Sequence, residues 1–389
     1  MENNSLTPLG SVLVTGGCGF VGFHIVRYFL FAPTCTSVSV VSRNPTTNLL
    51  PGVSYHAGDI SDSIAMRALI NQVKPKVIIH SACPSAVSAS AATYEAITIK
   101  GTRNLLAIAS EAPSVKVLIY TSTATMAAGA AHRDLDESTT LADTDPKAPA
   151  YARAKALADK MVLAANDPPR LLTATIRLPL VYGERDLLAI PATLAALEKG
   201  QTNFQVGGNK NLYDFVSVDN SAAAHVLLAK SLLAQVNRER DDPALPKVDG
   251  EAFNITDGPE GRHYFWDYPR LVWHAASEDL KGTEGIEPYT FNAQKTWVIP
   301  TWLALLLADA LEWIYWLFTL GTKRPYHFGR QQVEYFCFER TYSITKARRR
   351  LGYVPRGDWE EGVRKAVRWN LEEGGGGKRL RGRGVKKMR

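Results

Sequence analysis

Short apolar runs alternate with longer segments of helical periodicity over the first half of the chain. Consecutive apolar positions, typical of strands that are covered on both faces, occur at residues 11–15, 37–41, 76–80, 115–120 and 172–178. Between these runs, apolar residues recur at helical spacing over residues 20–31, 63–73, 94–111 and 151–165. This alternation predicts an α/β fold of the Rossmann type, with a doubly wound parallel sheet.

The pattern becomes irregular after residue 178, where glycine and proline are frequent. One clear helical segment, residues 220–235, stands in this part, and we expect a smaller C-terminal lobe that also returns some elements to the sheet. The predicted parts are a Rossmann domain over 1–178, which includes the helix at 151–165, a smaller lobe over 179–295, an apolar segment over 296–321, a helical part over 322–373 and a basic tail over 374–389.

Composition indicates a globular protein with a large core, because 46% of the 389 residues are hydrophobic and 21% are charged. The formal net charge of +7 arises from residues 374–389, which contain seven Lys and Arg and no acid. We expect this tail to be a disordered, solvated end. Attraction to anionic lipid headgroups is the second interpretation, and no nucleic-acid partner is expected.

The four cysteines, Cys18, Cys35, Cys83 and Cys337, lie far apart, so the sequence indicates neither a disulfide framework nor a zinc ribbon. No cluster of His, Cys, Asp and Glu has the spacing of metal ligands, and no metal is predicted. The N-terminal residues lack the basic flank and apolar run of a signal peptide, so secretion is not expected.

A glycine-rich turn follows the first predicted strand and opens the first predicted helix. Gly16, Gly19 and Gly22 form a G-x-x-G-x-x-G pattern in this context. The first glycine permits a tight turn, the second lets the backbone approach a pyrophosphate, and the third lets helix and sheet pack closely. The turn therefore predicts a nicotinamide dinucleotide on the helix N-terminus, next to Phe20 and Val21, with the lobe at 179–295 holding the substrate.

The choice of dinucleotide is expected at the end of the second strand, where an acid would accept hydrogen bonds from the ribose 2′-hydroxyl. Ser42 and Arg43 occupy this place. NAD and NADP both stay open, with NADP slightly favoured, because a guanidinium could pair with a 2′-phosphate. Arg43 as a solvated loop residue is the alternative. Asp59 and Ile60 are predicted at the adenine ring.

The residues that end the strand at 76–80 are expected beneath the cofactor. They are His80, Ser81 and Ala82. His80 has an equally weighted alternative as a core histidine with satisfied hydrogen bonds.

Tyr151 and Lys155 stand four residues apart on a predicted helix, so both side chains project from one face. A neighbouring ammonium favours the phenolate form of a tyrosine, and Lys155 would also hold the nicotinamide ribose. Hydroxyls at the end of an earlier strand supply a partner for the substrate oxygen, with Thr123 the first choice and Ser122 the second. Simple filling of the strand is the alternative for these hydroxyls.

Together these residues resemble the extended short-chain dehydrogenase/reductase superfamily, and within it the 3β-hydroxysteroid dehydrogenase and sterol-4α-carboxylate 3-dehydrogenase (decarboxylating) family. The matching segments, from Val12 to about Gly258, are VLVTGGCGFVG, GDI, VIIHSACP, KGTRNLL, VLIYTSTAT, YARAKALAD, IRLPLVYGERD, DFVSVDNSAAAHVLLA and FNITDG. Two positions depart from the family's pattern: Thr98 stands where such enzymes often carry Asn, and Ser42 replaces the expected acid.

The resemblance implies NAD(P)-dependent oxidation of the 3β-hydroxyl of a sterol or triterpenoid to a ketone. Tyr151 would take the C3 hydroxyl proton while hydride leaves C3, with Thr123 steadying the oxygen. If the substrate carries a C4 carboxylate, the product is a β-keto acid that can lose carbon dioxide. The alternatives are an NADPH-dependent reductase of another lipophilic ketone in specialised metabolism and a non-catalytic dinucleotide-binding scaffold.

Residues 302–320 form an apolar run near the length of a bilayer span, but Asp309 and Glu312 interrupt it. We predict a monotopic helix that lies on the cytosolic face of the endoplasmic reticulum membrane, from which the substrate is drawn. A buried helix of a cytoplasmic protein and a true span are the alternatives, and the oligomeric state stays open. The residues that favour the interface are Trp302, Trp313, Tyr315 and Trp316, flanked by Lys295, Lys323 and Arg324.

Overall fold

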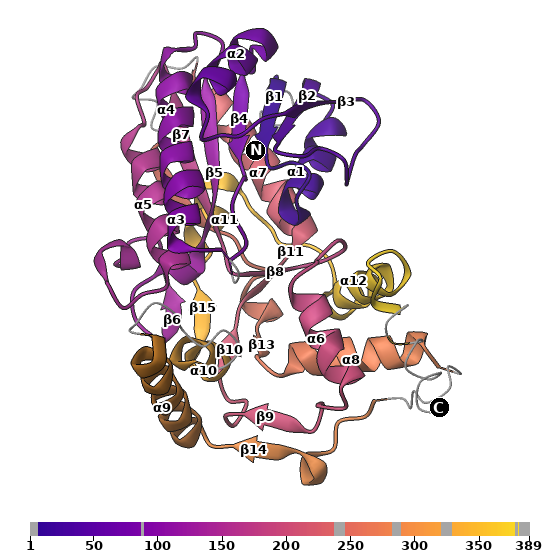
Figure 1. Cartoon of the computed structure of the whole chain (residues 1–389). Helices are drawn as coiled ribbons and strands as arrows, with labels where there is room; N and C mark the ends of the chain where they lie inside the picture. Colours follow the sequence, from indigo (N-terminus) through magenta and orange to yellow (C-terminus); the bar gives the residue numbers. More distant parts are fainter. Residues whose placement is uncertain are drawn as a thin grey trace.

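The computed structural model describes residues 7–86, 89–236, 246–281, 289–319, 329–377 and 380. Seven strands form its central parallel sheet: β1 (Gly10–Thr15), β2 (Cys35–Ser42), β3 (Val53–Ala57), β4 (Val77–His80), β5 (Val117–Thr123), β7 (Leu172–Leu178) and β12 (Glu251–Asn254). Their order is β12-β7-β5-β4-β1-β2-β3 (Figure 1). The direction of strand order changes between β1 and β4, and ligands of such sheets bind outside the carboxyl ends of the strands at this point.

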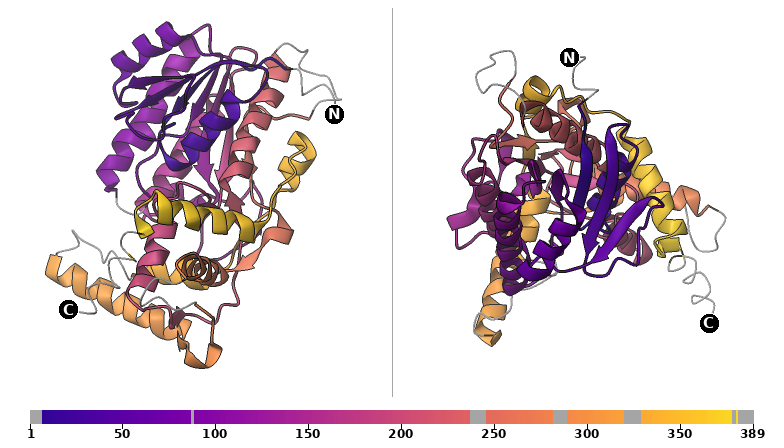
Figure 2. Two further views of the ribbon diagram at one scale, coloured as in Figure 1. Left: turned by 90° about the vertical axis from the view of Figure 1, so that its right-hand side faces the viewer. Right: turned by 90° about the horizontal axis from the view of Figure 1, so that it is seen from above.

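Helices cover both faces of the sheet, which confirms the predicted fold class (Figure 2). On one face, α1 (Phe20–Leu30) and α7 (Val218–Val236) pack their apolar sides against the strands in one core cluster. On the other face, a second cluster joins the strands to the apolar sides of α2 (Ser63–Val73), α4 (Gly101–Glu111) and α5 (Ala150–Ala164).

Three elements of this domain differ from the sequence prediction. The edge strands β3 and β12 were not predicted, because they are short and, in β3, only partly buried. The helix expected over 94–111 is divided into α3 (Ala91–Thr93), a π-helical segment (Tyr94–Lys100) and α4. A π-helical turn inside a longer helix is frequent at functional sites.

The smaller lobe is assembled from segments that are distant in the sequence. β6 (His132–Leu135), β10 (Leu212–Tyr213), β13 (His263–Tyr264) and β15 (Arg340–Tyr342) form a sheet in the order β13-β10-β15-β6. Two short pairs also belong here: β8 (Leu180–Tyr182) with β11 (Phe215–Ser217), and β9 (Phe204–Val206) with β14 (Trp297–Ile299). Thus β6, which precedes residue 178, joins the lobe, and β12, which follows it, joins the central sheet.

A third core cluster holds the lobe together. It joins the apolar faces of α6 (Ala189–Glu198), α8 (Asp267–Asp279) and α12 (Trp359–Glu372). Leu380, inside the segment predicted as a disordered tail, is only 6% exposed and packs into this cluster. Residues 378–379 and 381–389 of that tail, and the flanking Lys323 and Arg324, lie outside the described residues.

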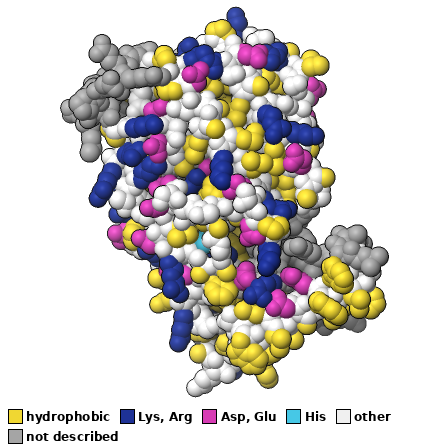
Figure 3. Space-filling model, turned by 90° about the vertical axis from the view of Figure 1, so that its left-hand side faces the viewer, with side chains coloured by type: hydrophobic (Ala, Val, Ile, Leu, Met, Phe, Trp, Pro, Cys, Tyr) yellow, Lys and Arg dark blue, Asp and Glu magenta, His cyan; other side chains and the backbone are white. Residues whose placement is uncertain are grey.

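The predicted apolar segment forms helix α9 (Thr301–Thr319), which α10 (Arg330–Cys337) contacts on one side. Within the described ranges, α9 is the one helix long and apolar enough to cross a membrane, judged by length and composition. It buries only Ala304 and Ala308, which is not the pattern of a core helix. Figure 3 shows apolar side chains gathered along the lower edge of the molecule, where α9 and β14 lie.

Candidate active site

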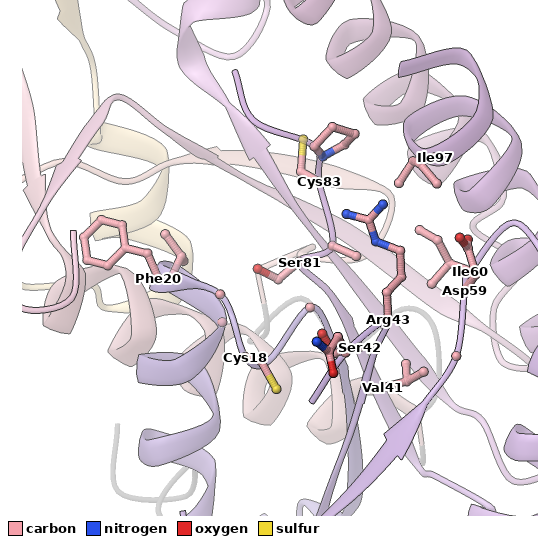
Figure 4. A pocket seen from close by; sticks show the side chains of 18 of the residues that line it. Cys18, Phe20, Val41, Ser42, Arg43, Asp59, Ile60, Ser81, Cys83 and Ile97 are labelled. Carbon is pink, nitrogen blue, oxygen red and sulfur yellow. The ribbon is translucent and has the colours of Figure 1, made fainter. Parts of the chain in front are cut away.

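A cavity of about 410 Å³ lies at the carboxyl ends of β1, β2 and β4 (Figure 4). The structure brings together on its wall the predicted residues Gly16, Gly19, Phe20, Val21, Gly22, Ser42, Arg43, Asp59, Ile60, Ser81 and Ala82. Sequence reasoning missed the further lining residues Cys18, Val41, Asn44, Thr47, Gly58, Cys83, Pro84 and Ile97. Most of these adjoin predicted residues in the chain, whereas Ile97 belongs to the π-helical segment.

The glycine turn has no room for side chains. Gly16 has a φ of +72°, and an added Cβ would lie 2.7 Å from the Cα of Ala82. At Gly22 an added Cβ would lie 2.2 Å from the carbonyl oxygen of Gly16. Helix α1 begins here with Gly19 as its N-cap and no acid in its first turn, so its free N–H groups attract anions. The turn and cavity therefore fit the pyrophosphate of a dinucleotide.

The end of β2 places a cation, not an acid, at the cavity. Arg43 is exposed and points into the space between Ser81 and Ile60 (Figure 4). Among the described residues it has neither an ion-pair partner nor a hydrogen-bond partner. Across from it, Asp59 accepts hydrogen bonds from the backbone N–H and the hydroxyl of Ser61, at 2.8 and 2.7 Å.

His80 is not among the residues that line the cavity. Its side chain is 0% exposed, with Nδ1 2.8 Å from the Thr15 hydroxyl and Nε2 3.0 Å from the Thr102 hydroxyl. Burial, with the charge of Lys155 as a smaller cause, lowers the pKa of His80 to about 3. The alternative interpretation, a core histidine with satisfied hydrogen bonds, describes this arrangement.

Lys155 is buried on α5 and faces the end of β5. Its Nζ donates to the carbonyl oxygen of Thr121 at 2.7 Å and lies 4.5 Å from the ring centroid of Tyr120. Helix α5 is held against β7 by a buried ion pair, in which Nη2 of Arg177 lies 2.6 Å from Oδ2 of Asp159. Sequence reasoning missed this pair, because the two residues are eighteen positions apart on different elements.

Tyr151 stands one turn before Lys155 on α5, and its ring packs edge-to-face on Tyr94 with centroids 5.9 Å apart. Burial and the nearby Cys83 raise the pKa of the Tyr151 phenol, and the hydrogen bond with Thr123 opposes this shift. We expected Lys155 to lower the pKa of Tyr151, but burial has the larger effect and raises it. The reason is that burial penalises the phenolate, whereas Lys155 is directed at Thr121.

Of the two candidate hydroxyls on β5, Thr123 is the one that interacts with Tyr151. The Thr123 hydroxyl also donates to the carbonyl oxygen of Leu178 at 3.1 Å. Ser122 is buried, and its hydroxyl lies 3.5 Å from the sulfur of Met126. Thr98, on the π-helical segment, is 1% exposed, and its hydroxyl has no hydrogen-bond partner among the residues that the structure describes.

A buried arginine that sequence reasoning missed lies beyond this group. Arg340, on β15, is 9% exposed and forms no ion pair with an acid among the described residues. Its Nη1 lies 3.3 Å from Nδ1 of His132, and its guanidinium lies 5.3 Å from the ring centroid of Tyr335. Its Nε has no hydrogen-bond partner in the described part of the chain. The sequence around Arg340 does not predict that this side chain is buried, because its neighbours in space come from β6 and α10.

Residues 13–284 match the model of the 3-beta hydroxysteroid dehydrogenase/isomerase family. The chain belongs to this family. The predicted resemblance to this family is thereby confirmed.

Three relatives are each named sterol-4-alpha-carboxylate 3-dehydrogenase, decarboxylating. The protein of Schizosaccharomyces pombe is 32% identical over 93% of this chain and 98% of its own length. The protein of Saccharomyces cerevisiae is 31% identical over 95% of this chain and 100% of its own length. The protein of Bos taurus is 28% identical over 91% of each.

Solved structures agree on the fold. UDP-glucose 4-epimerase of Thermotoga maritima, with UDP-glucose, has a TM-score of 0.65 at 20% identity and covers 92% of this chain and 98% of its own. dTDP-glucose 4,6-dehydratase of Bacillus anthracis, in complex with NAD, has a TM-score of 0.64 at 18% identity and covers 93% of this chain and 97% of its own. At such identities the likeness concerns the Rossmann fold alone.

Proposed function

We propose that this protein oxidises the 3β-hydroxyl of a sterol or triterpenoid that carries a carboxylate on C4, and that the resulting β-keto acid loses carbon dioxide. One observation supports the proposal above all: Tyr151 interacts with Thr123 at the end of β5, where Lys155 binds the Thr121 carbonyl, in a chain whose relatives bear the name of this reaction. Cys83 lines the cavity and also influences the pKa of Tyr151, so the two regions adjoin.

Three residues of the chain handle the proton and the oxygen of the C3 hydroxyl during the oxidation. A nicotinamide dinucleotide, when bound, accepts the hydride from C3. Tyr151 takes the proton of the C3 hydroxyl, and Thr123 holds the same oxygen in place. Lys155, fixed by the Thr121 carbonyl, holds the cofactor ribose and supplies a positive charge that, against the effect of burial, favours the phenolate. Ser122, directed at Met126, is the weaker candidate.

Arg340 supplies a counter-ion for the C4 carboxylate. A buried guanidinium is costly without an acid, and no acid among the described residues pairs with it. Its unpartnered Nε and its two-pronged geometry suit a carboxylate ligand. Electron density left on C4 by the departing carbon dioxide passes to the C3 oxygen, where the proton on Tyr151 neutralises it.

NADP is the proposed preference over NAD. The unpaired guanidinium of Arg43 and the neutral Ser42 at the end of β2 support it, because a 2′-phosphate gains a cation there and meets no acid. Asp59 and Ile60 are proposed to meet the adenine ring from the opposite wall, and Ser81 and Ala82 to lie beneath the cofactor.

Helix α9 is proposed to lie on the cytosolic face of the endoplasmic reticulum membrane as a monotopic anchor. Its outer face exposes large apolar side chains, with Trp302, Trp313 and Phe318 exposed by 67%, 66% and 82%. The two acids that interrupt the helix are both engaged by Arg330, whose Nη1 lies 2.7 Å from Asp309 and whose backbone N–H donates to Glu312 at 2.8 Å. Because these acids turn toward α10, the outer face suits a bilayer boundary.

A substrate panel tests the proposed function. We expect reduced cofactor and released carbon dioxide with a 4α-carboxy-3β-hydroxysterol, and reduced cofactor alone with its C4-unsubstituted analogue. The Tyr151→Phe variant should lose at least about a thousandfold in kcat and keep its dinucleotide affinity, because only the proton acceptor is removed. If the protein reduces unrelated lipophilic ketones with NADPH and oxidises neither sterol, the proposal is wrong and the protein is a reductase.

A further inference from the structure

We propose that Tyr335 is a substrate-binding residue, whose phenol donates a hydrogen bond to the acid group next to the reacting carbinol and so fixes the substrate between Tyr151 and Arg340. The inference rests on the proposed function. It assigns a ligand-binding role to helix α10, for which the sequence analysis named no site residue.

Tyr335 is held rigidly on α10 by aromatic neighbours of the lobe. Its ring lies edge-on to Tyr213, with centroids 5.6 Å apart, and edge-on to Phe265, with centroids 6.0 Å apart. Its carbonyl oxygen accepts a hydrogen bond from the Tyr213 hydroxyl. The guanidinium of Arg340 packs 5.3 Å from the centroid of the same ring. The ring is therefore placed before any ligand arrives, which reduces the entropy cost of using it.

The same ring lies close to the catalytic group of α5. Burial is the main cause that raises the pKa of Tyr151, and the nearby Tyr335 is the smallest of the causes that raise it. The backbone supplies a second, geometric connection: the chain leaves β5 after Thr123 and reaches His132, whose Nδ1 lies 3.3 Å from Nη1 of Arg340. Tyr342, the residue that binds the same nitrogen of His132 at 2.8 Å, shares a small cavity with Ala124. Strand β15, which carries Arg340 and Tyr342, thus reaches the small cavity at the end of β5.

The Tyr335 hydroxyl is available, unlike those of Tyr94 and Tyr342. The Tyr94 hydroxyl donates to the carbonyl oxygen of Ser85 at 2.6 Å, and the Tyr342 hydroxyl is bound to His132. Among the described residues, no hydrogen bond is made by the hydroxyl of Tyr335. Burial raises the pKa of Tyr335, so the phenol stays protonated and acts as a donor. A donor beside an unpaired guanidinium is the arrangement that a carboxylate completes, with one oxygen for each.

Helix α10 is anchored on its other side. Val333 is fully buried against Ala304 and Ala308 of α9, and Arg330 pairs with Glu334 at 2.9 Å as well as with Asp309. The position of Tyr335 is therefore set by packing that does not involve the hydroxyl, and removing that hydroxyl should leave the fold intact.

The test uses Tyr335→Phe in the full-length protein, with two sterol substrates. For the 4α-carboxy-3β-hydroxysterol we expect KM to rise about tenfold with kcat within about twofold, because a hydrogen bond to a charged group is lost. For the C4-unsubstituted 3β-hydroxysterol we expect no change in either constant. Tyr264→Phe, at a 45% exposed tyrosine of the same lobe, is the matched control and should behave as the unmodified protein with both substrates.

An equal loss with both substrates would show a structural role and overturn the inference, as would no loss with either. These outcomes differ from failure of the proposed function, in which the unmodified protein itself does not oxidise the acidic sterol.

Discussion

At the scale of single residues, two arginines are the proposed binding groups for anionic parts of the ligands. Arg340 is buried without an acid, whereas Arg43 is exposed at the mouth of the dinucleotide cavity. Both lack an ion-pair partner among the described residues, and both lie where an anionic group of a ligand is proposed. Paired arginines elsewhere, such as Arg177 with Asp159, hold the fold together instead.

The role of Arg43 leads to a prediction about cofactor choice. Arg43→Ala should weaken NADP binding by about tenfold or more, because a charge-assisted pair with the 2′-phosphate is lost, and should change NAD affinity by less than about twofold. Quenching of tryptophan fluorescence measures both affinities. Arg103→Ala, an exposed arginine on α4 away from the cavity, is the control. A clear preference of the unmodified protein for NAD would contradict the interpretation of Ser42 and Arg43.

At the scale of elements, α9 has two faces with different partners. One face packs the small side chains Ala304 and Ala308 against α10 and directs Glu312 toward Arg330. The other face exposes large apolar and aromatic side chains to the outside. A core helix would bury these side chains, so the exposed face requires another apolar surface. The adjoining strand β14 adds Trp297, which is 73% exposed.

The exposed face of α9 predicts how the protein partitions onto lipid. The double variant Trp313→Gln, Leu317→Gln should bind anionic phospholipid vesicles at least about tenfold more weakly, because burial of each side chain contributes roughly 1.5–3 kcal/mol. Vesicle sedimentation measures the bound fraction. The control is Phe31→Gln, which removes a 74% exposed aromatic ring from the far domain. Equal partitioning of all three proteins would rule out α9 as the lipid-facing element.

At the scale of the whole molecule, four histidines are buried in the fold: His24, His80, His132 and His225. Burial is the main cause that lowers the pKa of His80 to about 3 and that of His24, His132 and His225 to about 4. In the unfolded chain a histidine titrates near its ordinary value of 6.5. Between these values the unfolded state binds more protons, so stability must fall as the pH falls.

We therefore predict a lower free energy of unfolding at pH 6.0 than at pH 7.5. Each buried histidine should cost roughly 1 kcal/mol at the lower pH. Asp214 opposes this trend, since burial raises its pKa to about 6 and the folded state then takes up a proton, but it offsets only about half of the effect of one histidine. Urea unfolding at the two pH values measures the difference, and His225→Gln should reduce it. Identical midpoints at the two pH values would contradict the prediction.

The sequence by itself determined the βαβ alternation, the glycine turn and the spacing of Tyr151 and Lys155. These are local features, because strand and helix periods, and the lack of room for a Cβ at Gly22 beside the Gly16 carbonyl, depend on residues that are close in the sequence. Only the tertiary structure decided the features that depend on burial and on partners distant in the chain. They include the enclosure of His80 between two threonines, the isolation of Arg340 from any described acid, and the engagement of both acids of α9 by Arg330. A pattern of adjacent residues does not say which distant side chain, or which solvent, a group will face.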